Sequence, residues 1–538
     1  MQRFANLVDS LAFTQSRNRK LSLLTDYFLT TSDPDRGWAL AALTDGLPLR
    51  VPLRRILPEI LADIVDPVLY HLSRDYVGDT AETVALLWPD RPEYQRDGAR
   101  VTLDSVVTAF ATAPNSSHAE ILKGLLDALE PSSRFALLKL LGGAPRVGVS
   151  ARLAKLALAQ AFEQPVSEIE ESWHAVDAPY LALFDWLNGD GPRPDPGGRP
   201  VFRPMMLAHP IEDEDRTKLD PDDLLAEWKW DGIRVQVAAQ MGEVRLFSRT
   251  GDDISAGFPD IVTAFTGRNC ILDGELLVVR EDEVAPFNDL QQRLNRKTVS
   301  ARMVRDYPAH IRLYDSLQID EKDLRDLPLI ERRKRLEHWH RAHPPLSTDL
   351  SPLVPFNTFD ELTHLWQNTR AEGIEGLMLK RKDSPYLSGR PRGHWWKWKR
   401  APLTLDCVLM YAQRGSGKRS SYYSDYTFGV WRDAPDDGAE LVPVGKAYSG
   451  FTDAELLELD RFIRSNTTDR FGPVRAVSPK LVLEVAFDAL QKSTRHKSGI
   501  AMRFPRIARI RWDKPVSEAD TLSRAQSLLK APSLDKRG

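Results

Sequence analysis

The sequence has little cysteine, no large excess of charge and no long apolar run. Cys270 and Cys407 are the only cysteines among 538 residues, which excludes a four-cysteine zinc site and favours a reducing compartment over a disulfide. No apolar run reaches the roughly 20 residues that cross a bilayer, and residues 1–9 lack the basic head and apolar core of a secretory signal. These absences predict a cytoplasmic protein without a membrane span.

Basic residues are concentrated in two stretches, although the net charge is only −3. Residues 492–514 hold eight Lys/Arg and one acid, and residues 390–400 hold five Lys/Arg and no acid. Such clusters are typical of an electropositive footprint for nucleic acid. For an isolated charge run, a solvated face is the commoner interpretation.

Composition and periodicity divide the chain at residues 188–200, which are dense in Pro and Gly and therefore predict a linker. Helical spacing dominates before it: Ser117 with Glu120 fits a capping box, and Ser150 is expected to cap a second helix. Between these helices, residues 142–149 form a glycine-rich approach to a helix N-terminus. That approach suits a phosphate, and a plain helix–helix turn is the alternative.

Short strands replace the helices after the linker. Residues 270–279 and 311–314 have the pattern of strands, and a polar helix is expected at residues 329–340. From Thr404 onward, strands alternate with turns, which suggests a small β-barrel. We therefore predict an all-α domain at 1–187, a linker at 188–200, a mixed α/β domain at 201–401 and a β-barrel at 402–538.

Lys229 carries the strongest single signal for chemistry. It lies in Glu227–Arg234, where Asp231 and Gly232 supply a tight turn between two runs of strand character. A lysine at such a junction can point into a cleft and, in its neutral form, act as a nucleophile. Taken alone, the motif favours a solvated lysine beside a turn over a nucleophile in a cleft. The residues discussed next decide between these two interpretations.

Lys397 and Lys399 form a second cationic feature. In a strand, a period of two places both on one face and Trp396 and Trp398 on the other. Two aligned ammonium groups would neutralise an α-phosphate and lower the pKa of a third lysine nearby.

Carboxylates, guanidinium groups and an aromatic ring complete the pattern. Glu275 and Glu375 lie on apolar strands, and together with the lysines they fit the few carboxylates that Mg²⁺ takes. Arg234 and Arg249 can clamp phosphate or ribose-edge groups, because guanidinium forks suit bidentate acceptors. Tyr314 offers a ring for a purine to stack on, with a core aromatic as the alternative.

One apparent motif is discarded. Residues 415–418 read Gly-Ser-Gly-Lys, but Ala412 stands where a phosphate loop needs its first glycine and Arg419 replaces its Ser or Thr. The segment is not a P-loop.

Taken in chain order, these residues resemble the nucleotidyltransferase motifs of the ATP-dependent DNA ligases. Segment Glu227–Arg234 looks like the adenylated-lysine motif, and residues 501–514 are similar to the last, barrel-borne motif. The likeness is strong over about residues 203–514 and extends weakly to Arg146–Val149 in the helical region. The internal motifs are matched by Ser248-Arg249, Glu275, Tyr314-Asp315, Glu375-Gly376 and Lys397-Trp398-Lys399.

The resemblance implies a multidomain fold: an all-α N-terminal DNA-binding domain, a mixed α/β nucleotidyltransferase (adenylation) domain and a C-terminal OB-fold β-barrel. It implies that Lys229 attacks the α-phosphate of ATP, that AMP then passes to the 5′-phosphate of a nick, and that the 3′-hydroxyl displaces it. The implied partners are ATP, Mg²⁺ (with Mn²⁺ left open) and nicked double-stranded DNA, encircled by a monomer without reading sequence. The implied setting is DNA repair, recombination or replication, at the nucleoid in a prokaryote.

The resemblance also gives each matched residue a role. Lys229, Lys397 and Lys399 are expected to be catalytic, and Glu275 and Glu375 to hold the metal. Among the expected nucleotide contacts, Glu227 and Tyr314 hold adenine and Arg249 the sugar side, while Arg511 and Lys514 orient the leaving pyrophosphate. Further expected contacts with the nucleotide are Arg234, Glu275, Lys397 and Arg390. The spacing leaves open whether Arg390 or Arg392 makes the family's phosphate contact.

Departures from the family pattern are modest, and several rivals remain. Tyr314 replaces a commoner phenylalanine, and the glycine often found after Asp320 is missing. RNA ligases and GTP-dependent mRNA capping enzymes use the same lysine chemistry, but the helical N-terminus and residues 503–514 favour a DNA ligase. The lack of a zinc–cysteine cluster disfavours NAD⁺-dependent sealing. The intact lysines and Glu375 disfavour a non-catalytic DNA-binding scaffold.

Overall fold

The computed structural model describes residues 1–14, 16–49, 51–62, 64–91, 94, 100–143, 145–294, 296, 298–368, 373–399, 402–415, 423–433, 440–448, 450, 452–494 and 496–529. Residues 416–418 of the discarded glycine motif, and Arg400 and Arg495 of the two basic stretches, lie outside this set. The chain forms two compact units. Among the described residues, one takes in Met1–Leu23, Ala41–Val149 and residues 402–529, and the other takes in Leu24–Leu40 and residues 150–399.

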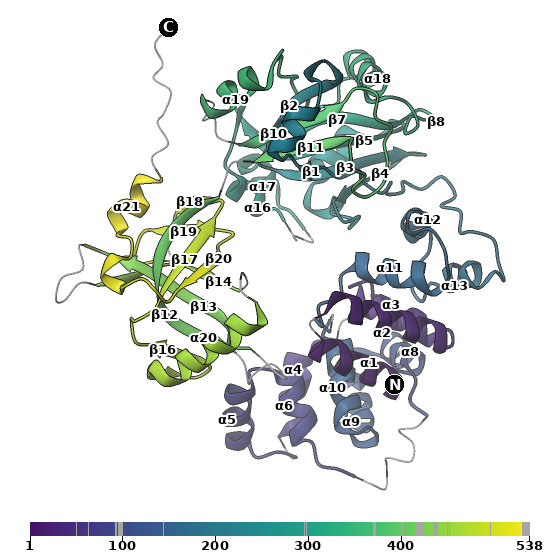
Figure 1. Ribbon diagram of the computed structural model, residues 1–538. Helices are drawn as coiled ribbons and strands as arrows, with labels where there is room; N and C mark the ends of the chain where they lie inside the picture. The colour runs from purple at the N-terminus through teal and green to yellow at the C-terminus, as the bar shows by residue number, and fades with distance from the viewer. Residues whose placement is uncertain are drawn as a thin grey trace. The chain divides into compact units, whose positions relative to one another are not determined.

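The described chain before residue 189 is helical (Figure 1). The Ser150 hydroxyl accepts a hydrogen bond from the Leu153 N–H at 3.2 Å, so the predicted cap is confirmed. Ser117 instead closes a short 3-10 turn with φ −91° and ψ −7°, and its hydroxyl makes no capping bond, so the predicted capping box is wrong. The helices are α1 Gln2–Phe13, α2 Arg17–Thr30, α3 Asp35–Leu43, α4 Leu53–Leu61, α5 Pro67–Val77, α6 Thr80–Leu87, α8 Leu103–Thr112, α9 His118–Ala128, α10 Pro131–Gly142, α11 Ala151–Ala161, α12 Val166–Ser172 and α13 Leu181–Asn188.

Asn188 ends α13, residues 189–200 contain neither helix nor strand, and two sheets follow. That residues 188–200 form an interdomain linker stays a prediction. The larger sheet has the strand order β4-β3-β5-β7-β8, with β6 beside β5 and β9 beside β7, and the smaller has the order β1-β11-β10-β2. The strands are β1 His209–Pro210, β2 Leu224–Trp230, β3 Ile233–Gln240, β4 Glu243–Ser248, β5 Cys270–Arg280, β6 Glu283–Val284, β7 Ala309–Ile319, β8 Lys322–Asp323, β9 Thr348–Leu350, β10 Ile374–Arg381 and β11 Trp395–Lys399.

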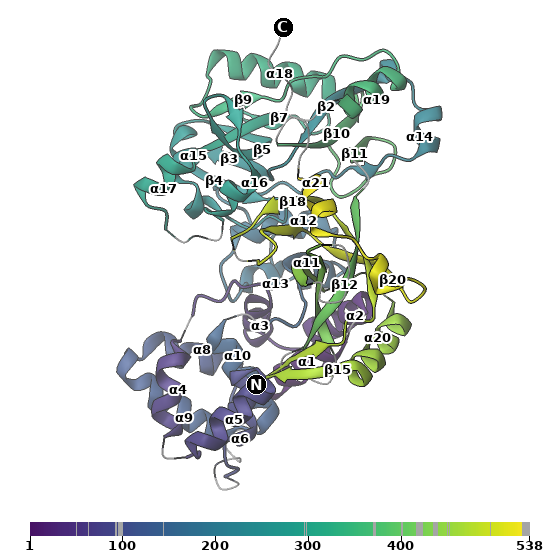
Figure 2. The same cartoon turned by 90° about the vertical axis from the view of Figure 1, so that its left-hand side faces the viewer.

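Helices cover the outer faces of these sheets (Figure 2). The predicted polar helix is α18, Leu329–Ala342, whose buried Leu336 and Trp339 pack with the core of the larger sheet. Helix α19, Phe359–Asn368, packs Leu362 and Trp366 against the smaller sheet. Shorter helices are α14 Asp213–Lys218, α15 Pro259–Ala264, α16 Phe287–Gln291 and α17 Ala301–Asp306.

The turn at Asp231 and Gly232 sends β2 and β3 into different sheets. The predicted strand–turn–strand is confirmed, but β2 pairs with β10 whereas β3 pairs with β4 and β5. A Cβ at Gly232 would lie 2.5 Å from the Leu276 carbonyl oxygen and 2.8 Å from Cγ of Glu275, so a larger residue would force the turn away from β5. The end of β2 is thereby held close to both sheets.

The C-terminal part is rich in strands. Strand β12 pairs with β13, β16 and β17, and β17 also pairs with β20. One buried cluster, which includes Leu409, Phe428 and Val485, fills its interior. The elements are β12 Leu403–Arg414, β13 Tyr423–Trp431, β14 Leu441–Ala447, α20 Asp453–Asn466, β15 Thr467–Phe471, β16 Val474–Val477, β17 Val482–Phe487, β18 Ala489–Lys492, β19 Ile500–Arg503, β20 Arg506–Arg511 and α21 Leu522–Ser527.

Cys270 and Cys407 are both buried free thiols, so the chain uses neither in a disulfide. Within the part of the chain that the structure describes, no helix has the length and apolar character needed to cross a membrane.

Candidate active site

A cavity of about 380 Å³ is lined by residues from both sheets of the 201–399 region. This volume is within the roughly 300–1,000 Å³ of small-molecule sites. Strands β2, β3, β5, β7, β10 and β11 and the turn after β4 all contribute side chains. The residues singled out in the sequence that line it are Glu227, Lys229, Arg234, Arg249, Glu275, Tyr314, Glu375, Lys397 and Lys399.

Lys229 and Lys399 share one carboxylate in this cavity. Strand β10 lies between β2 and β11, and Gly376 pairs with Lys229 on one side and with Lys399 on the other. Glu375 forms an ion pair with Lys229, and its second oxygen accepts a hydrogen bond from Nζ of Lys399 at 2.8 Å. Burial acts to raise the pKa of Glu375, but the two ammonium groups outweigh it and hold the pKa below its ordinary value.

The two lysines of β11 lie on one face, as predicted. Lys397 and Lys399 line the cavity, while Trp396 and Trp398 belong to the apolar cluster under α19. Burial and the neighbouring cations of Arg390 and Lys399 lower the pKa of Lys397. A surface that gathers this many cations favours a ligand with several negative charges.

Glu275 enters the same cavity from β5. Burial raises its pKa to about 7 against the opposing effect of Lys229 and Arg234, and the charge of Glu375 adds to the rise. Among the described residues, no group of three or more His, Cys, Asp or Glu could hold a metal ion. Two carboxylates that repel each other fit Mg²⁺, which takes one or two carboxylates and fills its shell with water and substrate phosphates.

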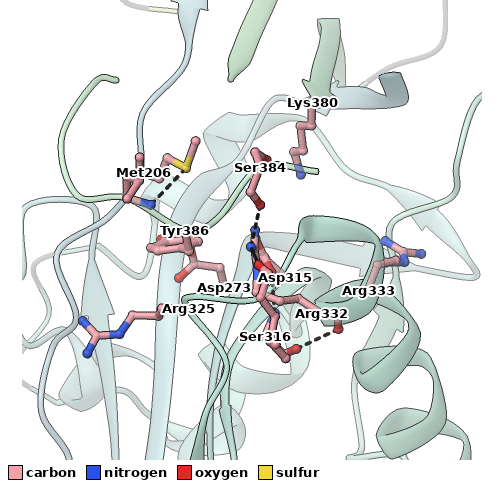
Figure 3. Close-up of polar contacts among 12 residues, drawn as sticks. Met206, Asp273, Asp315, Ser316, Arg325, Arg332, Arg333, Lys380, Ser384 and Tyr386 are labelled. Atoms are coloured by element: carbon pink, nitrogen blue, oxygen red, sulfur yellow. Dashed lines mark hydrogen bonds and ion pairs between the residues drawn. The ribbon is translucent and has the colours of Figure 1, made fainter. Parts of the chain in front are cut away.

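Arg234 is fixed by protein partners but keeps one free donor. Its Nη2 donates to Asp273 at 2.7 Å, and its Nη1 donates to the Met206 carbonyl at 2.5 Å. Tyr386 also donates to Asp273, and the two side chains lie together in Figure 3. The Nε of Arg234 is buried and has no partner in the described chain. A buried N–H without an acceptor is costly, so this atom points to a ligand acceptor in the cavity.

Lys380 is a cavity residue that sequence reasoning missed. A strict strand period of two would place it on the face opposite Glu375, five positions earlier, and the register of β10 is shifted between Ile374 and Gly376. Its Nζ lies 3.2 Å from Oε1 of Glu227 and 4.4 Å from the centre of the Tyr314 ring. Burial lowers the pKa of Lys380 although Glu227 opposes this. Lys380 thus fixes the Glu227 carboxylate and lies over the Tyr314 ring with the same ammonium group.

A buried ion pair supports the strand that carries Tyr314. Asp315 and Arg332 have fully buried side chains, with Nε–Oδ1 at 2.8 Å and Nη2–Oδ2 at 3.0 Å. Arg332 also donates through Nη1 to the Ser384 carbonyl at 2.8 Å, and Figure 3 shows its side chain between Asp315 and Ser384. Helix α18, strand β7 and the segment after β10 are thus joined behind the cavity.

Replacement of Asp315 by Ala is therefore expected to destabilise this unit strongly. The change leaves the Arg332 guanidinium buried without a counter-ion, which costs about 3–5 kcal/mol. Lys218 is the matched control: it pairs with Glu214, and their side chains are 72% and 82% exposed, so Lys218→Ala should cost about 1 kcal/mol or less. Denaturant unfolding measures both, and equally small losses would contradict the assigned role of the buried pair.

Three predicted nucleotide residues are not part of the cavity lining. Arg390 lies close enough for its charge to lower the pKa of both Arg249 and Lys397, which favours it over Arg392 for the phosphate contact. Arg511 and Lys514 belong to the strand-rich domain, where they pair with Asp513 at 2.9 Å and Asp406 at 2.7 Å. Their contact with pyrophosphate stays a prediction.

Comparison with known proteins identifies the family to which the chain belongs. Residues 205–399 match the model of the ATP dependent DNA ligase domain, and residues 419–514 match that of the ATP dependent DNA ligase C terminal region. A probable DNA ligase of Koribacter versatilis is 32% identical over 99% of this chain and 97% of its own length. The chain belongs to the ATP-dependent DNA ligase family.

Other relatives agree with this assignment. A DNA ligase of Archaeoglobus fulgidus is 32% identical, with 80% of this ligase and 78% of that protein covered. A solved structure named Pmar-Lig_PreS3 has a TM-score of 0.55 and 16% identity, covers 94% of this ligase and 99% of that chain, and supports the fold alone. The ligase therefore has N-terminal helices, an adenylation domain and a strand-rich C-terminal domain, uses ATP, and acts on DNA through the lysine–AMP intermediate characteristic of the family.

Proposed function

We propose that this ligase seals nicks in double-stranded DNA and that Lys229 is the residue that becomes adenylated. The observation that carries the proposal is the shared cavity, which Lys229 lines together with three further lysines and three carboxylates. Phosphoryl transfer needs little covalent help from a protein beyond in-line positioning and charge stabilisation. This set of side chains supplies both.

In the first step, the nitrogen of Lys229 would form a bond to the α-phosphorus of ATP while the bond to pyrophosphate breaks. The amine attacks in its neutral form, so its ion pair with Glu375 must open and its proton must leave first. Lys397 and Lys399, on β11, would neutralise the charge that develops on the phosphate oxygens. AMP would then pass to the 5′-phosphate of the nick, and the 3′-hydroxyl would displace it.

Glu275 and Glu375 would hold Mg²⁺, which would neutralise phosphate oxygens, and Mn²⁺ is the alternative ion. Glu227 and Tyr314 would contact adenine, because both line the cavity and Lys380 holds the Glu227 carboxylate in place. Arg249 would contact the sugar side, and the free Nε of Arg234 would donate to the nucleotide.

The domain limits that we propose are 1–187, 201–401 and 402–538, joined by the linker at 188–200. Strands β12, β13, β14, β17 and β20 around one apolar core support an OB-fold for the last domain. A ligase of this kind would act as a monomer that encircles DNA. Its barrel would bring Arg511 and Lys514 to the pyrophosphate.

Incubation with α-labelled ATP, Mg²⁺ and nicked duplex tests the proposal. The label should attach to the protein and leave it when nicked DNA is added, and sealed product should appear. Labelling by GTP alone would point to mRNA capping, and discharge only on nicked RNA would point to RNA ligation. Failure to label with either nucleotide would contradict the proposal.

Nick affinity is expected to fall steeply with added salt. Contacts to phosphates release counterions, so a protein with 6–10 such contacts loses roughly 10³- to 10⁵-fold in affinity between 50 and 200 mM salt. Titration of labelled nicked duplex at several salt concentrations measures this slope. An affinity that does not change with salt would contradict binding through the phosphate backbone.

A further inference from the structure

The helices just before the linker are tied to the adenylation domain by one acid. In Glu171 of α12, Oε1 lies 2.6 Å from Nη1 of Arg325. Its Oε2 lies 3.2 Å from Nη1 of Arg203 and 3.3 Å from Nη2 of Arg193. Arg203 precedes β1, and Arg325 follows β8. The Glu171 side chain is only 17% exposed, so these ion pairs are partly shielded from solvent, which strengthens them.

His174 extends this attachment to the strand that leads to Arg249. Its ring centre is 4.7 Å from that of Phe247 at the end of β4 and 6.5 Å from that of Phe202. It also makes a backbone hydrogen bond with Gly251. Burial and the nearby cation of Lys155 lower its pKa to about 4, so the ring is neutral at ordinary pH.

The turn that His174 supports has an unusual backbone. Residues 248–253 reverse the chain after β4, and the Ser248 N–H donates to the Asp252 carbonyl at 2.8 Å. Gly251 has φ +84°, and a Cβ there would lie 2.9 Å from the Phe202 ring. Lys155 of α11 lies 4.7 Å from the centre of the Trp173 ring, and the charge of Asp252 acts on it. Residues of the 150–175 segment thus support this turn.

The geometry points to His174 as a positioning residue for the nucleotide. His174 contacts both Phe247 and Gly251, on either side of Arg249 in the sequence. It therefore fixes the backbone of the turn from which the Arg249 side chain enters the cavity. The helical segment before the linker is in this way a structural part of the nucleotide site, in addition to any contact that it makes with DNA. The inference rests on the proposed contact between Arg249 and the nucleotide.

A double-mutant cycle in the full-length protein tests the inference. The variants are His174→Ala, Arg249→Ala and the pair together, with the rate of self-adenylation measured against ATP concentration. We expect His174→Ala to raise the ATP concentration for half-maximal rate about five- to tenfold, the effect of one lost hydrogen bond, with little change in the rate at saturating ATP. In the Arg249→Ala background, His174→Ala should have no further effect, because both changes act through the same group.

Two further variants separate positioning from general stability. His174→Asn places an amide N–H near the position of the imidazole Nδ1 and should recover much of the lost ATP affinity. Ile169 is a fully buried residue of α12, and Ile169→Ala should lower the melting temperature and leave the ATP dependence unchanged.

The inference is overturned if His174→Ala leaves the ATP dependence of self-adenylation unchanged. It is also overturned if His174→Ala weakens ATP use as much in the Arg249→Ala background as in the original protein, or if Ile169→Ala changes the ATP dependence as much as His174→Ala does. Should Arg249→Ala itself leave the ATP dependence unchanged, the proposed contact of Arg249 with the nucleotide fails as well. Nick sealing through Lys229 would stand in that case. If His174→Ala does not fold, His174→Phe takes its place in the cycle, because it keeps the ring against Phe247 and removes the hydrogen bond.

Discussion

Replacement of Lys229 by Ala is expected to abolish labelling of the protein by ATP, with a loss on the order of 10⁴- to 10⁶-fold, the range seen when a nucleophile is removed. No neighbouring lysine takes over the role of the lost nitrogen, because Lys397 and Lys399 both lie on β11, which is separated from β2 by β10. The measurement is transfer of α-label from ATP to protein, followed to long times.

The same variant should still seal a nick that already carries AMP on its 5′-phosphate. The last step forms its bond between two DNA atoms and does not use the Lys229 nitrogen, so sealing of this substrate shows that the variant is folded and binds DNA. Lys218, a largely exposed lysine, gives the matched control, and Lys218→Ala should label normally. A Lys229→Ala protein that keeps the covalent label would contradict the assignment.

Glu375→Gln is expected to reduce self-adenylation by about 10²- to 10³-fold, the cost of removing one preorganised electrostatic group. Glu375 is the acid that contacts both Lys229 and Lys399, so its loss misplaces two ammonium groups and removes half of the proposed metal site. Saturating ATP should not restore the rate, because the defect lies in the reacting geometry as well as in binding.

Glu337→Gln is a suitable control for that experiment. Glu337 pairs with Arg333 on α18 at 2.8 Å and is 36% exposed, and it does not line the cavity. Its replacement should leave self-adenylation within a fewfold of the unchanged protein. A Glu375→Gln variant as active as the Glu337→Gln control would contradict the role given to Glu375.

Much of the site follows from sequence because each residue type has a local reason to be where it is. Asp231-Gly232 forces a turn, and the strand period places Lys397 and Lys399 together. The ordered series of motifs then indicates that residues far apart in sequence converge. The cavity contains Lys229, Glu275, Tyr314 and Glu375 as this order implies.

The remaining features depend on tertiary contacts that no local pattern records. Nothing in the sequence around Gly232 indicates that β2 and β3 enter different sheets, because that follows from the close approach of β5. The predicted Ser117 capping box was wrong because Ser117 is the last residue of a 3-10 turn. Its backbone is therefore helical, whereas a capping residue normally has an extended backbone. The ties of Glu171 and His174 to the adenylation domain were also missed, since ion pairs and ring contacts between distant segments leave no periodic signal.

The most direct test of the central claim is to locate the AMP on the unmodified chain. The protein is incubated with ATP and Mg²⁺, digested, and its peptides are examined by mass spectrometry under conditions that preserve a phosphoramidate. The account predicts AMP on Lys229 and its disappearance after incubation with nicked DNA. An adduct on any other lysine, or one that nicked DNA does not remove, would contradict it.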